Sequence, residues 1–227
     1  MNEIEQRINE RANTFVITAN PEIVMYARQH RAYRKILKTA DFITPDGIGI
    51  VKAAQILNQP VAERISGYDL FTHLLAWGNH HRKSVFFLGA REPVINSLNK
   101  VVHQRFPRLR VAGSHNGYFS DAKPIIQEIH HSHPDMVFVA LGYPQQEQFI
   151  SHYRHFNNGL WIGIGGSFDV LSGKVKKAPQ FWVNHNLEWF YRLIKNPWRI
   201  GRMMALPKFM GVVYKQKISQ LFKSNSK

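Results

Sequence analysis

Residues 42–54 read Phe-Ile-Thr-Pro-Asp-Gly-Ile-Gly-Ile-Val-Lys-Ala-Ala, and this stretch decides the fold class. A short apolar run ends at Thr44, and Pro45-Asp46-Gly47 has the composition of a turn. Apolar residues then recur at helical spacing from Ile48 onward. The pattern predicts a strand, a turn and a helix, with Asp46 at the carboxyl end of the strand, where ligands bind in open α/β sheets. The simpler alternative is that Asp46 only caps the helix.

The same alternation of apolar runs and helical patterns continues along the chain. The strand candidates are residues 14–18, 41–44, 84–89, 109–113, 136–142 and 161–166. The helix candidates are residues 2–13, a segment that opens at Asn20-Pro21 and has an apolar face running to Ile36 and Leu37, and residues 48–58, 70–80, 91–105, 121–132 and 145–155. Six strands separated by helices predict an α/β fold with a Rossmann-like, mostly parallel sheet and helices on both faces.

The character of the sequence changes after Asp169. Residues 173–179 have the composition of a loop, and helical patterns follow as far as Phe222, interrupted at Asn196-Pro197. We therefore expect residues 1–172 to form the α/β domain and residues 173–227 to form a helical C-terminal appendage.

Composition limits the classes of protein that the chain can belong to. The 227 residues include no cysteine, which excludes disulfides, thiolate zinc sites and a cysteine nucleophile. The start of the chain does not resemble a secretory signal and no 18-residue stretch lacks charge, so an intracellular location is expected. The formal net charge is +15, and the segment after Asp169 holds 12 Lys or Arg residues but one acidic residue, Glu188. This basic segment indicates an anionic partner, namely nucleic acid, anionic lipid or phosphate groups, unless it only aids solubility.

The familiar catalytic motifs are missing. Residues 163–168 lack the third glycine of G-x-G-x-x-G and come late in the chain, and the sequence contains no Walker loop, no H-E-x-x-H, no D-x-D and no nucleophile elbow. What remains is a carboxylate at a strand end, arginines, amide side chains and backbone amides. This set suits group transfer from a phosphate-bearing donor, because a carboxylate can accept the proton of a hydroxyl nucleophile. Arginine or helix N-termini can then stabilise the departing diphosphate.

Six segments resemble, in order, the motifs of the WecG/TagA/CpsF family of bacterial glycosyltransferases, and the resemblance covers about residues 14–205. They are residues 18–22 (Thr-Ala-Asn-Pro-Glu), 45–49 (Pro-Asp-Gly-Ile-Gly), 64–69 (Arg-Ile-Ser-Gly-Tyr-Asp), 141–147 (Leu-Gly-Tyr-Pro-Gln-Gln-Glu), 163–169 (Gly-Ile-Gly-Gly-Ser-Phe-Asp) and 187–193 (Leu-Glu-Trp-Phe-Tyr-Arg-Leu).

The resemblance implies an inverting transferase that needs no metal or other cofactor. It would move an N-acetylhexosamine from a UDP donor to a sugar on undecaprenyl diphosphate, as a peripheral protein at the inner face of the cell membrane. The nearest branch in kind joins ManNAc to GlcNAc in the linkage unit of wall teichoic acid, whereas sibling branches use ManNAc-uronate or glucose. Family members can self-associate as homo-oligomers, but the sequence does not fix the oligomeric state. A nucleic-acid-binding module and a non-catalytic membrane scaffold remain as alternatives from other classes.

The resemblance also assigns roles to individual residues. Asp46 matches the proposed catalytic base, Thr18 and Asn20 match polar residues beside it, and Arg64 matches a pocket arginine. The expected donor-binding residues are Gln146, Tyr118, Asp169, Gly142, Gly165 and Gly166, with Tyr118 and Asp169 assigned to the uracil base. The purely structural alternatives are an ion pair of Arg64 with Asp69 and helix capping by Gln146 and Glu147.

The basic appendage resembles a membrane-docking segment of the family. Arg192, Arg199 and Arg202 match arginines expected to contact the acceptor diphosphate or the membrane. The aromatic side chains that suit an interfacial surface are Trp182, Trp189, Trp198, Phe209 and Tyr214. Their alternative is packing against the sheet domain, which is expected for Trp182 and Trp189. Removal of the chain after about residue 195 is expected to leave a folded, more soluble and inactive protein.

Overall fold

A computed structural model describes residues 1–61, 64–185, 187–195, 197 and 200–224 of the chain. The chain divides into two compact units, each assembled from segments that are not consecutive in sequence. The sheet unit comprises Met1–Thr18, Ala32–Thr44 and Ser66–Lys176, and the helical unit comprises Ala19–Arg31, Pro45–Ile65 and Lys177–Lys227. Segments from the first third of the chain therefore join the basic C-terminal segment, whereas the sequence pattern predicts a single division, after residue 172.

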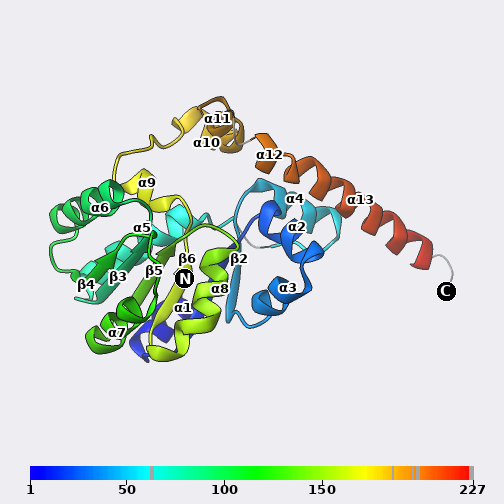
Figure 1. Ribbon diagram of the computed structural model, residues 1–227. Helices are drawn as coiled ribbons and strands as arrows, with labels where there is room; N and C mark the ends of the chain where they lie inside the picture. Colours follow the sequence, from blue (N-terminus) through cyan, green and yellow to red (C-terminus); the bar gives the residue numbers. More distant parts are fainter. Residues whose placement is uncertain (62–63, 186, 196, 198–199, 225–227) are drawn as a thin grey trace. The chain divides into compact units, whose positions relative to one another are not determined.

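The sheet has six strands in the order β2-β1-β6-β5-β3-β4 (Figure 1). Their bounds are β1 Thr14–Ala19, β2 Phe42–Pro45, β3 Ser84–Gly89, β4 Arg110–His115, β5 Met136–Ala140 and β6 Leu160–Gly163. The pairs β1/β6, β6/β5, β5/β3 and β3/β4 are all parallel. Strands β1, β3, β5 and β6 are buried along their whole length, as expected for central strands covered on both faces. The predicted α/β class and mostly parallel sheet are confirmed.

Helices cover the sheet in two groups. Helix α9 (Ser167–Leu171) contacts both α5 (Gly67–His80) and α6 (Glu92–Arg105). The short 3-10 helix η1 (Arg154–Phe156) contacts both α7 (Lys123–Ser132) and α8 (Gln145–Tyr153). The unit also contains α1 (Asn2–Asn9) and most of α3 (Arg31–Leu37). The predicted helices are therefore present, and α9 is an additional helix that the sequence pattern did not reveal.

Aromatic packing joins the first group of helices to the sheet. The ring of Phe71 on α5 lies 4.8 Å from that of Phe138 on β5 and 5.6 Å from that of Phe168 on α9. Phe87 on β3 makes an edge contact with Phe168 at 5.6 Å. All four rings are fully buried. Their burial fixes the start of α9, and with it the turn that follows β6.

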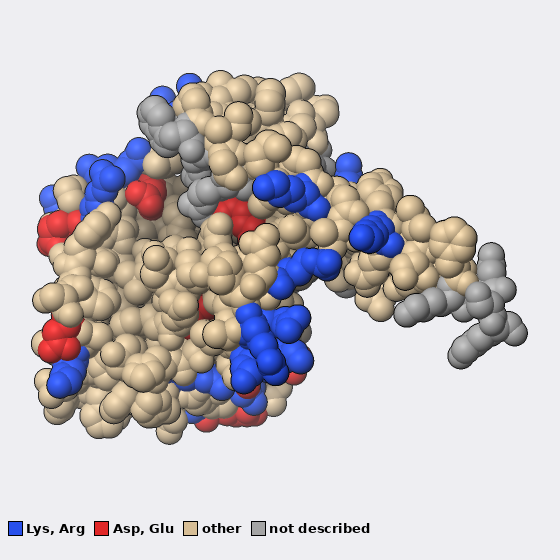
Figure 2. Space-filling view, turned by 45° about the vertical axis from the view of Figure 1, so that its right-hand side comes forward, with Lys and Arg blue, Asp and Glu red and all other residues tan. Residues whose placement is uncertain are grey.

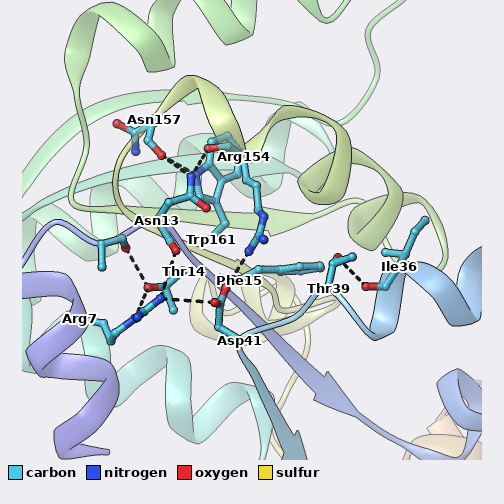
Figure 3. Close-up of polar contacts among 11 residues, drawn as sticks. Arg7, Asn13, Thr14, Phe15, Ile36, Thr39, Asp41, Arg154, Asn157 and Trp161 are labelled. Atoms are coloured by element: carbon cyan, nitrogen blue, oxygen red, sulfur yellow. Dashed lines mark hydrogen bonds and ion pairs between the residues drawn. The ribbon is translucent and has the colours of Figure 1, made fainter.

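A polar network fixes the opposite, amino-terminal edge of the sheet (Figure 3). The Asp41 carboxylate accepts hydrogen bonds from the Phe15 backbone N–H at 2.8 Å and from Arg154 at 2.7 Å, and it pairs with Arg7 at 3.4 Å. The Asn13 side chain donates to the carbonyl oxygens of Arg154 and Asn157. These contacts tie α1, β1 and η1 to the residue before β2.

The helical unit contains α2 (Pro21–Gln29), α4 (Ile48–Ile56), α10 (Gln180–Asn184), α11 (Glu188–Lys195), α12 (Ile200–Met203) and α13 (Ala205–Ser224). Helix α13 packs against α2 and α4 through a buried cluster of Ala53, Phe209 and Val213. Leu206 and Pro21 lie so close to Gly49 that a Cβ atom there would come within 2.7 and 2.9 Å of them. This packing makes α13 part of a folded unit.

Several details of the helical unit differ from the sequence prediction. Phe209, predicted as an interfacial side chain, is only 6% exposed and lies in the apolar cluster. The helical pattern that starts at Pro21 ends at Gln29, because His30 has extended backbone dihedral angles. The pattern between Trp182 and Leu193 is divided between α10 and α11. Among the described residues, no helix is both long enough and apolar enough to cross a membrane.

Candidate active site

The carboxyl ends of β1, β6 and β5 lie side by side in the middle of the sheet and carry several predicted site residues. Thr18, near the end of β1, donates a hydrogen bond from Oγ1 to the Gly163 carbonyl at 3.3 Å. Gly67, at the start of α5, lies against Thr18, since a Cβ atom there would come within 3.1 Å of Oγ1. Thr18 is only 6% exposed. It therefore joins β1 to the end of β6 at the edge where ligands bind in such sheets.

Gln146 reaches the turn after β6 from the first turn of α8. Its Oε1 accepts a hydrogen bond from the Gly165 N–H at 3.1 Å, and its Nε2 donates to Glu147 Oε1 at 2.7 Å. A Cβ atom at position 163 would lie only 2.6 Å from Nε2, so glycine there makes room for the amide. The side chain of Gln146 does not cap α8, whose N-cap is Pro144 and which has no side-chain cap hydrogen bond. It holds the backbone of a neighbouring loop instead.

Glycines shape the two loops at this edge. Gly142 has φ +77° and Gly165 has φ +50°, and both face open space at the Cβ position. Such positive φ values favour glycine. Gly166 is the N-cap of α9, and Asp169 stands in the first turn of that helix. A Cβ atom at Gly166 would lie 3.9 Å from Asp169 Oδ2, so the open turn and the partly exposed carboxylate are neighbours.

Tyr118 follows β4 and is 72% exposed. Its backbone N–H donates to Asn116 Oδ1 at 2.8 Å, and Asn116 in turn donates to Glu92. The neighbouring Gly117 donates to the Ala90 carbonyl at 2.8 Å and lies against Leu141, at the end of β5. The turn that carries Tyr118 is therefore anchored beside the ends of β3 and β5.

The helical unit holds the second group of predicted residues. Asn20 is the N-cap of α2, where its Oδ1 accepts the Ile23 N–H at 3.0 Å. The Asp46 N–H donates to the Ala19 carbonyl at 2.8 Å, which fixes the Asp46 backbone beside the end of β1. Gly47, with φ +92°, occupies the N-cap position of α4. Asp46 thus precedes the cap position, and its side chain is partly exposed.

Arg64 is held from two directions in the same unit. The N–H of the next residue, Ile65, donates to the Pro45 carbonyl at 3.1 Å, which keeps this loop beside the Asp46 turn. The Arg64 guanidinium donates to Glu188 Oε2 on α11 at 2.6 Å. Arg64 Nε is buried, and among the described residues it has no hydrogen-bond partner. The Arg64 side chain as a whole is 22% exposed, so part of it is accessible to an anionic ligand.

Sequence reasoning missed two residues that contact this machinery. Glu188 is the single acidic residue after Asp169, and this isolation in a basic segment was the signal that could have singled it out. Tyr33 donates from its hydroxyl to Glu147 Oε2 at 2.9 Å across 114 positions of sequence. No local pattern in the sequence marks that pairing.

The basic C-terminal segment exposes large apolar side chains among its charges. Figure 2 shows Lys and Arg side chains on the surface among many uncharged ones. The exposed apolar residues of this segment include Phe181, Trp189, Phe190, Ile194, Ile200, Met204, Tyr214, Ile218, Leu221 and Phe222. Arg192 lies in α11 and Arg202 in α12, but their side chains, like the whole of Arg199 and Trp198, lie outside the described residues.

Trp182 and Trp189 differ in their surroundings. The Trp182 ring lies 6.0 Å from that of Phe190 and 5.8 Å from that of Tyr191, so it packs among the aromatic side chains of α11. Trp189 is 37% exposed. Trp182 is partly exposed, so of the two Trp189 is the more accessible to an interfacial partner.

The predicted residues thus form two groups, each held together within its own unit. Thr18, Gln146 and the Gly163–Gly166 turn are linked in the sheet unit, and Asn20, Asp46 and Arg64 are linked through backbone contacts in the helical unit. In the described part of the chain, no group of three or more His, Asp or Glu side chains is arranged to hold a metal ion. Metal independence of the reaction stays a prediction.

Comparison with known proteins gives consistent matches over nearly the whole chain. A relative from Bacillus spizizenii (strain ATCC 23059 / NRRL B-14472 / W23) is 47% identical over 209 residues, which cover 92% of this chain and 81% of the relative. A relative from Bacillus subtilis (strain 168) is 44% identical over 210 residues, covering 92% and 82%. One from Staphylococcus aureus (strain MW2) is 38% identical over 207 residues, covering 90% and 81%. All three are named N-acetylglucosaminyldiphosphoundecaprenol N-acetyl-beta-D-mannosaminyltransferase.

The family model described as "Glycosyl transferase WecG/TagA/CpsF family" matches residues 1–223, a range that includes the sheet unit, all but the last four residues of the helical unit, and every predicted site residue. With this match and these relatives, the chain belongs to the WecG/TagA/CpsF family of glycosyl transferases.

Proposed function

We propose that the protein transfers N-acetylmannosamine from UDP-ManNAc to GlcNAc-diphospho-undecaprenol and so builds the linkage unit of wall teichoic acid. The acceptor and the transferred sugar are those in the names of the relatives, which align with 90% or more of this chain. The sibling reactions with ManNAc-uronate or glucose are not favoured by these names.

The observation that carries the chemistry is the position of Asp46 in the turn between β2 and α4. Its backbone is fixed to Ala19, and its side chain is partly exposed beside the Asn20 cap. In the proposed reaction, the Asp46 carboxylate takes the proton of the acceptor hydroxyl as that oxygen attacks C1 of ManNAc. The bond between C1 and the UDP oxygen breaks, UDP leaves with the electron pair, and the configuration at C1 inverts.

The leaving diphosphate needs positive charge or N–H donors. Arg64 supports this role, because its guanidinium is permanently charged and its side chain, although paired with Glu188, is still 22% exposed. Hydrogen bonds from arginine to phosphate are short and strong. We propose that Arg64 stabilises the departing diphosphate without a metal ion.

The donor nucleotide is assigned to the sheet unit. The Gly163–Gly166 turn leads into α9 beside the partly exposed Asp169, and Gly142 and Gly165 have open space at their Cβ positions. Asp169 and Tyr118 are proposed to contact the uracil base, the first by hydrogen bonds and the second by stacking. The exposure of Tyr118 leaves its ring accessible for stacking.

Because the acceptor is a lipid, the reaction takes place at a membrane surface. The exposed apolar residues of α10 to α13 stand among lysines, a combination typical of helices that lie in the membrane interface. We propose that this segment docks on the anionic inner face of the cell membrane and that Arg192, Arg199 and Arg202 contact lipid or acceptor phosphates.

The test is an assay of UDP release with a panel of UDP-sugars and a lipid-linked GlcNAc acceptor. Fastest turnover with UDP-ManNAc is expected, and chelation with EDTA is expected to leave the rate unchanged. Preference for UDP-ManNAc-uronate or UDP-glucose would assign the protein to a sibling reaction. Failure to release UDP from every donor, together with salt-sensitive binding of a generic oligonucleotide, would overturn the proposal.

A further inference from the structure

Gln146 and Glu147 are neighbouring polar residues at the start of α8, and both are almost completely buried, at 4% and 1% exposure. The Gln146 amide can adopt two orientations that differ by a half-turn about its last bond. In one of them Oε1 faces the Gly165 N–H, and in the other Nε2 would face it. The second orientation opposes two donors and is unfavourable.

Glu147 selects between these orientations. Its Oε1 accepts from Gln146 Nε2 at 2.7 Å, so a flipped amide would set its own oxygen against the carboxylate oxygen. The second carboxylate oxygen accepts the Tyr33 hydroxyl at 2.9 Å, and Tyr33 is only 2% exposed. Both oxygens of Glu147 are thus engaged, and the carboxylate cannot rotate without losing a buried hydrogen bond.

The oriented amide acts on the turn that follows β6. Gly163 leaves room for the amide, since a Cβ atom there would lie 2.6 Å from Nε2. Gly165 is held by its N–H in a conformation with φ +50°, one residue before the N-cap of α9. The shape of this turn therefore depends on which atom of Gln146 faces Gly165.

We propose that Glu147, anchored by Tyr33, is a positioning residue that orients Gln146 and thereby holds the Gly163–Gly166 turn in its donor-binding shape. The donor-binding part of this statement rests on the proposed function. Gln146 then contributes to the site by fixing the backbone of the turn, because its oxygen and one of its amide hydrogens are already engaged within the protein.

The experiment compares Glu147→Leu, Glu147→Gln and Tyr33→Phe with Ser84→Ala as a control. Gln at position 147 can accept from Gln146 and donate to the Tyr33 oxygen, whereas Leu can do neither. Ser84 forms buried hydrogen bonds with Asp135 at the amino end of β3, at the other edge of the sheet. Its replacement removes buried polar contacts without touching the β6–α9 turn.

The direct readout is hydrogen exchange of the Gly165 amide, measured by NMR alongside the melting temperature and the steady-state constants. Glu147→Leu is expected to speed exchange at Gly165 about tenfold or more and to raise KM for the donor more than it lowers kcat. Tyr33→Phe should have a smaller effect in the same direction, and Glu147→Gln should restore both quantities. Ser84→Ala should lower the melting temperature while Gly165 exchange stays as in the wild type.

The outcomes separate this inference from the proposed function. If the wild type transfers ManNAc while Glu147→Leu leaves Gly165 exchange and KM unchanged, the positioning role is wrong and the proposed function stands. If Gly165 exchange changes as expected while the wild type uses no UDP-sugar, the proposed function is wrong and the positioning role of Glu147 stands. If Glu147→Leu does not fold, unchanged Gly165 exchange in Tyr33→Phe overturns the positioning role.

Discussion

Two aspartates stand at the ends of β2 and have different surroundings. Asp41, before the strand, is engaged by Arg7, Arg154 and the Phe15 N–H at the amino-terminal edge of the sheet. Asp46, after the strand, has its backbone fixed to Ala19 and precedes the N-cap of α4. The first carboxylate therefore serves the fold, and the second is the one proposed to serve the reaction.

Changing each aspartate to asparagine separates these roles. Asp46→Asn is expected to lower kcat by about 10²- to 10⁴-fold, the usual contribution of a general base, while the melting temperature stays near that of the wild type. Asp41→Asn keeps an acceptor for the Phe15 N–H but weakens two partly exposed ion pairs, so a loss of stability of about 1 kcal/mol is expected, with kcat retained. UDP release and urea unfolding measure the two effects. Near-normal turnover by Asp46→Asn would remove Asp46 from the role of base.

The Arg64–Glu188 ion pair predicts a coupling between a predicted pocket residue and the C-terminal segment. Glu188→Gln removes the charge that orients Arg64, and a fall in kcat/KM of about fivefold is expected for a half-buried pair of this kind, equivalent to about 1 kcal/mol. In an Arg64→Met background the same change should have no further effect. A double-mutant cycle on kcat/KM measures this coupling. Additive losses would mean that Glu188 acts independently of Arg64.

The buried Glu147 gives stability a specific pH dependence. Burial raises the pKa of its carboxyl group, while hydrogen bonds from Gln146 and Tyr33 oppose this rise. Since the folded state then binds its proton more tightly than the unfolded state, the contribution of this group to stability is greatest at low pH. This contribution decreases as the pH rises from the ordinary glutamate pKa, about 4.3, through the raised value in the folded protein.

Glu147→Gln removes this titration and keeps both hydrogen-bond partners. The difference in unfolding free energy between wild type and variant should therefore shift in favour of the variant as the pH rises above the ordinary glutamate pKa, about 4.3. Urea unfolding at several pH values measures this shift. A difference that stays constant, or that moves toward the wild type, would contradict the raised pKa.

At the scale of elements, apolar runs and caps made much of the fold predictable. The strands β1, β3, β5 and β6 are continuous apolar runs because both faces of the sheet are covered, and Asn20-Pro21 marks the first turn of α2 by local chemistry alone. The break between α2 and α3 was missed because apolar spacing continues through His30, whose extended backbone interrupts the helix.

Some residues of the candidate site could be predicted from the sequence, but their long-range partners could not. Turn residues such as Asp46 and Gly165 can be identified from local composition, and the family resemblance assigned their roles. The long-range contacts could not be predicted, because the Tyr33–Glu147 and Arg64–Glu188 hydrogen bonds join positions 114 and 124 residues apart. Such contacts arise only from the way in which strands and helices pack. The same holds for Phe209, whose apolar side chain is equally compatible with a membrane interface and with the interior that it occupies.

Packing of α13 on α2 and α4 can be tested with two glycines. Gly49→Ala places a Cβ atom 2.7 Å from Leu206 and 2.9 Å from Pro21, and overpacking of this kind typically destabilises by about 1–3 kcal/mol. Gly211, on α13, has open space at its Cβ position, so Gly211→Ala should stabilise the helix by up to about 1 kcal/mol. Urea unfolding compares the two variants. Equal effects would mean that α13 does not pack closely at Gly49.

At the scale of the whole molecule, the basic C-terminal segment both folds and exposes apolar surface. Phe209 and Val213 are buried against Ala53, so removal of the chain after residue 195 would expose the faces of α2 and α4 to water. The structure therefore changes the expectation from sequence that such a truncation would be more soluble. Point substitutions that leave the buried face of α13 intact are the better test of membrane docking.

Helix α13 offers such a test because its two faces differ. At 100° per residue, Tyr214, Ile218, Leu221 and Phe222 lie within about 100° of one another, away from the face of Phe209 and Val213. The four apolar residues on this face are all more than half exposed, whereas Phe209 and Val213 are buried. Ile218→Asp with Leu221→Asp would place two charges on the exposed apolar face. Gln216→Asp with Gln220→Asp changes the net charge equally at exposed polar positions of the same helix.

Both double variants should keep the stability of the wild type, since neither alters the buried cluster. Binding to phosphatidylglycerol-containing vesicles should fall at least about tenfold more for Ile218→Asp/Leu221→Asp than for the control, because that pair also loses apolar insertion into the interface. Raising the salt concentration should weaken the binding that remains, which depends on charge alone. Vesicle sedimentation measures each affinity. If the two double variants lose the same affinity, the exposed apolar face does not enter the membrane, and docking rests on the excess of lysine and arginine alone.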